Sequence, residues 1–149
     1  MHPEPQIELR VASFRDLEPT TLYAILKLRS DVFVVEQKCF YADLDGRDTE
    51  PGTRHVWLSR GDEIAAYLRI LDDGDVERIG RVVVAPAERG TGLAGRLMTE
   101  ALQVVGHRTS VLDAQAHLVG LYGKFGYERT GPEYLEDGIP HVPMRLAKN

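Results

Sequence analysis

The chain has 149 residues, of which 43% are hydrophobic and 28% charged, and its formal net charge is −5. This composition is that of a globular protein with a sizeable core, and it excludes a disordered chain. The acidic balance disfavours nonspecific binding to nucleic acid or to an anionic membrane. We expect a single domain over residues 1–149, because no linker, repeat or low-complexity segment divides the chain.

The sequence also limits the compartment and the cysteine chemistry. Cys39 is the only cysteine of the sequence, so no internal disulfide can form. No apolar run has the length of a membrane span, and the N-terminus lacks a signal-peptide pattern. These features predict a cytoplasmic protein without a membrane partner. They leave the oligomeric state open, with a homodimer as one candidate.

The first half of the chain predicts one helix and four strands. Alternating or β-branched apolar residues indicate the strands, and apolar residues at helical spacing indicate the helix. Short turns join the last three strands, which makes them antiparallel neighbours. The expected elements are a strand at 7–11, a helix from 19 to about 37, an acidic loop at 43–52, and strands at 55–59, 64–71 and 76–84.

The second half predicts a crossover and a final strand. A helix at 93–105 joins the strand that ends at Val84 to the next strand, and such a connection implies parallel pairing. The further elements are a strand at 110–114, a short helix at 118–125, a polar loop at 133–140 and a strand at 141–146. The fold class is therefore α/β with a mixed sheet.

The most informative stretch runs from the strand end into the crossover helix. Val82, Val83 and Val84 suit a sheet, Pro86 ends the strand, and the segment 89–95 (Arg-Gly-Thr-Gly-Leu-Ala-Gly) opens the helix. The first amides of a helix lack intrahelical partners and attract phosphate oxygens. Gly90 and Gly92 let a phosphate approach the main chain. We interpret this stretch as a phosphate-binding loop.

Two kinds of phosphate ligand fit the loop. Residues 90–95 match G-x-G-x-x-G, the dinucleotide fingerprint, and Asp113 lies near the distance expected for a ribose-binding acid. However, that fingerprint should begin at the strand end, and residues 86–89 intervene. The second match, Arg89-x-x-Gly92-x-Ala94, resembles the acyl-CoA signature [Q/R]-x-x-G-x-[G/A] of the GNAT N-acetyltransferase superfamily.

Further motifs support the resemblance to the GNAT superfamily. Residues 121–127 (Leu-Tyr-Gly-Lys-Phe-Gly-Tyr) resemble its [F/L]-Y-x-x-x-G-[F/Y] segment. The chain is more closely similar to the ElaA-like branch. The motifs that carry this similarity are 32–39, Tyr41-x-Asp43-x-Asp45-Gly46, 114–118 and 136–141.

The resemblance implies a fold and a reaction. The fold is the GNAT fold, a mixed and mostly antiparallel sheet flanked by helices, with a splayed central parallel strand pair. The reaction is transfer of an acetyl group from acetyl-CoA, the cosubstrate, to a primary amine of a small molecule or peptide. The amine attacks directly in a ternary complex. The enzyme class is that of acyl-CoA-dependent N-acyltransferases, without a metal.

The resemblance also assigns roles. In the family a backbone N–H of the central strand polarises the thioester carbonyl, the loop holds the pyrophosphate, and a tyrosine acts as general acid. Gln115 stands where the family often has Asn. The residues expected to bind the cofactor are Val82, Val83, Val84, Arg89, Gly90, Thr91, Gly92, Leu93, Ala94, Gln115 and Tyr122.

For catalysis we expect Tyr122 as the general acid and Glu36 as the base. Tyr122 occupies the family's acid position, and Glu36 lies at the end of the first predicted helix, where the acceptor cleft forms. Cys39 lacks an evident paired base, which disfavours a two-step mechanism through a thiolate. Other candidate bases are Asp43, Asp45, His55, His117 and His141.

Several charged residues have an expected place without an assigned role. The segment Asp43-x-Asp45-Gly46-x-Asp48 is similar to the start of an EF-hand loop, but the later ligands are absent. We interpret it as an acidic surface loop that attracts a cationic acceptor. Arg69, Arg78 and Arg81 alternate with apolar neighbours, which predicts outward-facing strand residues.

Two other functions stay open at this point. A non-catalytic acyl-CoA-binding module would keep the phosphate loop without an acceptor site. A nucleotide-dependent oxidoreductase would use residues 90–95 as a dinucleotide loop.

Overall fold

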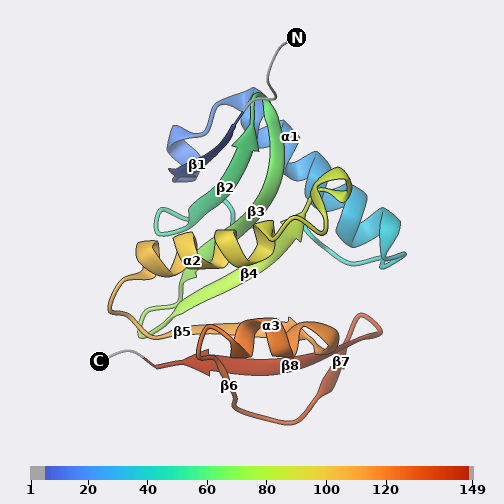
Figure 1. The fold of residues 1–149 in the computed structure, drawn as a ribbon, viewed down its shortest axis with the longest axis vertical. Helices are drawn as coiled ribbons and strands as arrows, with labels where there is room; N and C mark the ends of the chain where they lie inside the picture. The colour runs from blue at the N-terminus through green and yellow to red at the C-terminus, as the bar shows by residue number, and fades with distance from the viewer. Residues whose placement is uncertain (1–5, 148–149) are drawn as a thin grey trace.

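A computed structural model describes residues 6–147 of the chain, and Figure 1 shows its arrangement. Short 3-10 turns at 14–16, 86–88 and 116–118 and a π-helical turn connect the main elements. The helices are α1 (Pro19–Arg29), α2 (Leu93–Val105) and α3 (Val119–Gly123). The strands are β1 (Ile7–Ala12), β2 (Arg54–Arg60), β3 (Glu63–Asp72), β4 (Glu77–Val84), β5 (Ser110–Gln115), β6 (Glu128–Arg129), β7 (Tyr134–Glu136) and β8 (Ile139–Leu146).

The strands form one mixed sheet of eight strands. Its order is β1-β2-β3-β4-β5-β8-β6, and β7 also pairs with β8. The β4–β5 pair, which α2 connects, is parallel, and the other pairs are antiparallel. This topology confirms the predicted α/β class and the parallel pairing across the crossover.

The two central strands separate soon after they meet. β4 and β5 pair only at Glu77 with Ser110 and at Arg78 with Val111. Beyond these residues the strands diverge toward the carboxyl end of β4, as Figure 1 shows. The divergence confirms the expected splayed pair, and it divides the sheet into the half β1–β4 and the half formed by β5 to β8.

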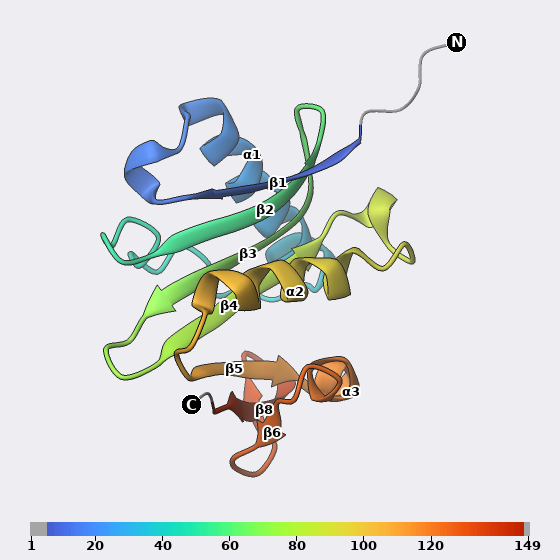
Figure 2. The same ribbon diagram turned by 60° about the vertical axis from the view of Figure 1, so that its left-hand side comes forward.

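Helices cover both faces of the larger half (Figure 2). Val56 and Leu58 of β2 face the main core, to which α2 contributes Leu97 and Met98. The intervening Trp57 faces the opposite side, where it belongs to a smaller core with Ile25 of α1. The alternation follows from the period of two in a β-strand, and it explains why β2 and β3 are buried on both faces.

Two expected elements differ from the structure. The helical region ends near residue 37 as predicted, but it is α-helical only to Arg29, and a π-helical turn covers Ser30–Glu36. The loop predicted at 133–140 contains β7 and the first residues of β8. Asp137 and Gly138 both have positive φ, 51° and 80°, which is the geometry of a two-residue hairpin turn. Polar composition concealed this hairpin because both faces of β7 are exposed.

Within residues 6–147, no helix combines the length and the apolar character that crossing a bilayer requires.

Candidate active site

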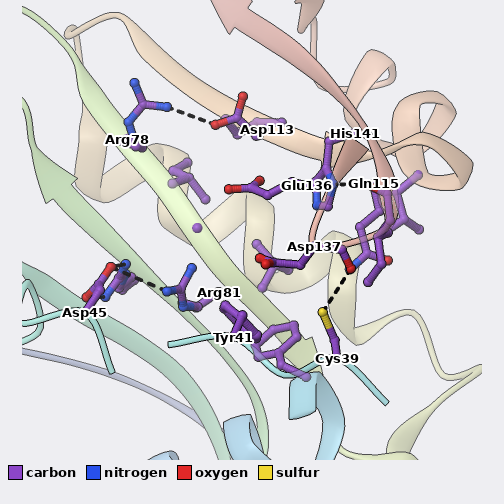
Figure 3. A pocket seen from close by; sticks show the side chains of 18 of the residues that line it. Cys39, Tyr41, Asp45, Arg78, Arg81, Asp113, Gln115, Glu136, Asp137 and His141 are labelled. Atoms are coloured by element: carbon purple, nitrogen blue, oxygen red, sulfur yellow. Dashed lines mark hydrogen bonds and ion pairs between the residues drawn. The ribbon is translucent and has the colours of Figure 1, made fainter. Parts of the chain in front are cut away.

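A cavity of about 410 Å³ lies where β4 and β5 diverge (Figure 3). β4, β5, α3, the β7–β8 hairpin and the segment that follows the π-helical turn all contribute to its walls. Among the lining residues are Cys39, Tyr41, Asp45, Arg69, Arg78, Gly80, Arg81, Val82, Leu112, Asp113, Gln115, Tyr122, Glu136, Asp137 and His141.

A β-bulge interrupts β4 at the wall of this cavity. Tyr67 pairs with Val83 and Arg69 pairs with Gly80, so β4 contains one residue more than β3 between these pairs. Arg81 lies in the bulge, and its φ is +53°. The left-handed conformation costs a non-glycine residue about 1–2 kcal/mol, so other contacts must stabilise it. A bulge bends its strand, which agrees with the divergence of β4 from β5.

Three arginines and three aspartates form a closed ring of ion pairs behind the bulge. Each guanidinium contacts two carboxylates, and each carboxylate contacts two guanidiniums. The order is Arg29, Asp43, Arg81, Asp45, Arg69, Asp48 and back to Arg29. We call these six residues the charge ring. It joins α1, the loop before β2, β3 and the bulge of β4.

The charge ring is largely buried. The side chains of Arg29 and Arg69 are 0% and 3% exposed, and those of Asp43 and Asp48 are 8% and 11% exposed. Hydrogen bonding from Arg69 holds the pKa of Asp45 well below its usual range. Burial opposes ionisation of Asp48, but the hydrogen bonds and charges of Arg29 and Arg69 together outweigh it and lower that pKa as well. Asp45 and Asp48 are therefore charged at neutral pH.

The ring corrects two expectations from the sequence. The loop at 43–52 is not an open acidic surface, because arginines neutralise Asp43, Asp45 and Asp48. Arg69 does not face outward but is buried, and Arg81 is about four-fifths buried. Within residues 6–147, no group of three or more His, Cys, Asp or Glu side chains is placed to hold a metal ion.

Tyr122 extends from α3 to the cavity. Its residue is 4% exposed, and its ring packs edge-on against Tyr127. Tyr127 is anchored in turn, with its hydroxyl 2.6 Å from Ser110 Oγ. No other described residue hydrogen-bonds the Tyr122 hydroxyl. Burial raises the pKa of Tyr122 to about 12, so the hydroxyl keeps its proton at neutral pH.

The predicted phosphate loop has an open main chain. Gly90 and Gly92 have φ of 80° and 81°, and a Cβ at either position would meet no atom within 4 Å. Gly92 is the N-cap residue of α2, and no side chain caps this helix end. The loop residues 89–94 do not line the cavity. The first turn of α2 faces the segment after α3, because a Cβ on Gly95 would lie 4.0 Å from Phe125 Cζ.

Glu36, the expected base, lies beside the phosphate loop rather than in the cavity. Its carboxylate forms an ion pair with Arg89, with 2.8 Å between Oε1 and Nη2, and both side chains are about half exposed. Of the residues expected to bind the cofactor, the cavity brings together Val82, Gln115 and Tyr122. Val83 belongs instead to the smaller core on the α1 face.

The histidine candidates for the base differ in position. His55 is 1% exposed and lies outside the cavity lining. Its Nε2 is 3.0 Å from the carbonyl oxygen of Asp48, and its Nδ1 is 2.7 Å from the Tyr67 hydroxyl. Because a carbonyl only accepts, Nε2 carries the proton and Nδ1 accepts from Tyr67. His141 lines the cavity, and His117 does not.

Two further polar groups of the cavity have identified contacts. Asp113 pairs with Arg78 across the β4–β5 divergence, with 3.2 Å between Oδ2 and Nη1. The Cys39 thiol donates to the main-chain oxygen of Asp137 at 3.2 Å and joins the two rims of the cavity (Figure 3). Burial raises the pKa of Cys39, which disfavours a nucleophilic thiolate.

Comparison with known proteins decides the family. The family model for an acetyltransferase (GNAT) domain matches residues 27–148. The chain belongs to the GNAT family. A UPF0039 protein of Mycobacterium tuberculosis is 47% identical over 141 residues, which are 91% of this chain and 90% of the relative. The ElaA protein of Escherichia coli is 43% identical over 145 residues, covering 93% and 95%. The resemblance to the ElaA-like branch is thus confirmed.

Solved structures confirm the GNAT fold. An acyl-CoA N-acyltransferase from Pseudomonas aeruginosa has a TM-score of 0.92 at 42% identity and covers 95% of this chain and 100% of its own. The Escherichia coli ElaA structure has a TM-score of 0.89 at 41% identity, covering 94% and 99%. The structure of an aminoglycoside 6'-N-acetyltransferase complexed with coenzyme A shares the fold at 16% identity and a TM-score of 0.70.

Sequence reasoning missed most of the charge ring. The regular spacing of Asp43, Asp45 and Asp48 was visible, but their partners lie 14 to 38 residues away. The position of Arg29 could have indicated the ring, because Arg29 occupies a position of α1 at which the helical period predicts an apolar residue. A charge at a core position indicates a buried partner.

Proposed function

We propose that the protein transfers an acetyl group from acetyl-CoA to a primary amine by direct attack in a ternary complex. The observation that carries this proposal is the juxtaposition of the β4 bulge with Tyr122. The two border one cavity at the place where the parallel strands diverge. The GNAT family supplies the reaction class, and the cavity supplies groups for its two polar tasks. These tasks are to stabilise an oxyanion and to protonate a leaving thiolate.

The phosphate loop fits the pyrophosphate of a CoA thioester. The N-terminus of α2 lacks a side-chain cap, and its flanking glycines leave the main chain open. Phosphate oxygens would satisfy these amides, and the positive end of the helix dipole would stabilise their charge. Arg89, Gly90, Thr91, Gly92, Leu93 and Ala94 are the residues proposed for this contact. CoA supplies the acetyl group as a thioester, which is activated for attack by an amine.

The segment 82–84 begins in the bulge, to which Val82 belongs, and is proposed to polarise the thioester carbonyl. A bulged residue lacks a partner in the adjacent strand, so the main chain here can turn an N–H away from the sheet. An oriented donor stabilises the oxyanion that forms during attack, most strongly where water is excluded. Gln115 on β5 lines the opposite wall and can hydrogen-bond the pantetheine amide groups.

Tyr122 is proposed as the general acid. As the amine nitrogen bonds to the carbonyl carbon and the carbon–sulfur bond breaks, the departing thiolate needs a proton. The Tyr122 hydroxyl is protonated and has no competing partner among the described residues. It can therefore donate to sulfur and recover a proton from solvent or from the nitrogen of the tetrahedral intermediate, which loses its proton as the amide forms.

The acceptor must lose a proton before attack, because a lysine-like amine has a pKa of about 10.4. Glu36 remains the proposed base, and in this role its carboxylate would have to leave Arg89. Binding of an anionic pyrophosphate at Arg89 would release it. His141 is the alternative, since it lines the cavity and its Nδ1 bonds only to the nearby carbonyl of Ile139 among the described residues.

The charges of the cavity favour a cationic acceptor. Arg69, Arg78 and Arg81 are paired with aspartates, whereas the carboxylates of Glu136 and Asp137 form no ion pair with any described residue. We therefore propose that the β7–β8 hairpin, rather than the loop at 43–52, attracts the cationic acceptor. A small amine or a peptide amine in the cytoplasm is the proposed substrate.

A two-stage experiment tests the function. Purified protein is first titrated with acetyl-CoA and, separately, with NADH. It is then incubated with acetyl-CoA and a panel of primary amines, while free CoA thiol is measured. Amine-dependent release of CoA supports the proposal. Binding without turnover across the panel would favour the non-catalytic acyl-CoA-binding module. No binding, with binding of NADH instead, would favour the oxidoreductase.

A further inference from the structure

We infer that the charge ring is a positioning device for the active site, which holds the β4 bulge through the side chain of Arg81. The inference deepens the proposed acetyltransferase function and rests on it. Arg81 is a positioning residue here, because its guanidinium contacts the carboxylates of Asp43 and Asp45.

The first step concerns the conformation of Arg81. A bulge residue with φ of +53° favours glycine, yet an arginine occupies the position. Its guanidinium makes several contacts on one side. Nε lies 2.8 Å from Asp43 Oδ1, and Nη2 lies 3.1 Å from the Asp43 carbonyl oxygen. The guanidinium also lies over the ring of Tyr41, 5.3 Å from its centroid. These contacts can stabilise a backbone conformation that an arginine would otherwise leave.

The second step concerns the anchors of the ring. Asp43 and Asp45 would be mobile loop carboxylates if Arg81 were their only partner. Arg29 fixes Asp43 from α1, with 3.0 Å between Nε and Oδ2. Arg69 fixes Asp45 from β3, with 2.9 Å between Nη1 and Oδ1. Asp48 bridges the two arginines at 2.7 Å from Arg29 and 3.1 Å from Arg69. The closed ring thus fixes the bulge relative to α1 and β3.

The third step leads from the ring to the chemistry. Val82 follows Arg81 directly and lines the cavity, and Val83 is fixed on the opposite face by the smaller core. The torsion at Arg81 therefore sets the direction of the next N–H groups, which are proposed to meet the thioester oxygen. Small displacements of an oxyanion donor have large effects on turnover, and much smaller effects on binding of the distant pyrophosphate.

The test uses two variants of the charge ring. Asp45→Asn removes a charge of the ring, keeps the shape of the side chain and lies 36 residues from Arg81 in the sequence. Arg81→Gly removes the guanidinium and keeps the left-handed backbone conformation accessible. Asp31→Asn is the matched control, since Asp31 pairs with Lys27 on the exposed side of the helix. We measure kcat, the Kd of acetyl-CoA, and amide hydrogen exchange of residues 82–84 in protein without substrates. Both ring variants should lower kcat at least tenfold and leave Kd within threefold.

Amide hydrogen exchange reports on the effect of the charge ring on the bulge independently of turnover. In Asp45→Asn, exchange at 82–84 should be at least fivefold faster than in the wild type and in Asp31→Asn. Unchanged exchange would overturn the inference whatever happens to kcat. Faster exchange with unchanged kcat would also overturn it, because the bulge would then move without consequence. Wild-type protein that lacks turnover would refute the proposed function instead, and the exchange data would still decide whether the ring holds the bulge.

Discussion

Glu36 and Arg89 form an ion pair that joins the end of the π-helical turn to the phosphate loop, 53 residues further along the chain. The arginine belongs to the acyl-CoA signature, and the glutamate is the proposed base. A pair that is about half exposed on both sides contributes about 0.2–1 kcal/mol. A pyrophosphate can therefore compete with it.

Substitution of Glu36 separates its two roles. If Glu36 is the base, Glu36→Gln should lower kcat by about tenfold or more. Glu36→Gln should also tighten acetyl-CoA binding slightly, because Arg89 loses a competing anion. If acetyl-CoA binds more tightly while kcat is unchanged, Glu36 is a partner of Arg89 and not the base. In that case His141→Gln should produce the loss of kcat instead.

Tyr122→Phe tests the general acid. The substitution removes the hydroxyl and keeps the ring that packs on Tyr127, so the stability of the fold should change little. We expect kcat to fall by about 10²-fold, within the range of general acid–base catalysis, while the Kd of acetyl-CoA stays constant. Steady-state kinetics with calorimetry of the same preparation makes the comparison. A wild-type kcat would remove Tyr122 from the mechanism.

Gly92→Glu tests the phosphate loop. Glutamate would put a negative charge at an open helix N-terminus and would strain a backbone with φ of 81°. We expect acetyl-CoA binding to be lost in a calorimetric titration. Gly92→Asn is the matched control, because asparagine tolerates the left-handed conformation and adds no charge. An equal loss of acetyl-CoA binding in both variants would show that the volume of the added side chain, rather than its negative charge, prevents binding.

Arg29→Met tests the contribution of the charge ring to stability. The substitution keeps an unbranched apolar stem but leaves Asp43 and Asp48 each with one guanidinium instead of two. Removing one partner of a buried ion pair costs about 3–5 kcal/mol. Urea denaturation should show a decrease of this size in the free energy of unfolding. Lys27→Met, which breaks an exposed pair on the same helix, should change it by less than about 1 kcal/mol.

His55 predicts how stability depends on pH. Burial lowers the pKa of His55, so the unfolded chain binds a proton near pH 6.5 while the folded protein does not. Stability should therefore be constant above about pH 6.5 and should fall, by at most ~1.4 kcal/mol per pH unit, as the pH decreases through the folded pKa. His55→Gln should flatten this part of a thermal denaturation series between pH 7 and pH 5. An unchanged slope would contradict the neutral tautomer assigned above.

The sequence predicted the parts of the fold that local patterns determine. The apolar runs at 55–59, 64–71 and 82–84 and the helical period of 93–105 each correspond to an observed element. The π-helical turn was not predictable, because the apolar spacing of Val32 and Phe33 suits an α-helix equally well. The hairpin at 134–146 depends on backbone angles at Asp137 and Gly138 that composition does not reveal.

Motifs of the proposed site could be recognised only where they are contiguous. Residues 89–94 and 121–127 are each one uninterrupted segment, so their proposed roles follow from the resemblance to motifs of the family. The charge ring joins residues from α1, a loop and two strands, and the bulge at Arg81 depends on the pairing register of β3 with β4. Such features follow from tertiary contacts, which give no periodic signal along the chain.

The most direct test of the central claim is turnover of acetyl-CoA with a cationic primary amine, followed as release of the CoA thiol by the wild-type protein. We predict saturable, amine-dependent release that Tyr122→Phe reduces by about 10²-fold. Release that does not depend on the amine, or an absence of release although acetyl-CoA binds, would contradict the assignment of this chain as an N-acetyltransferase.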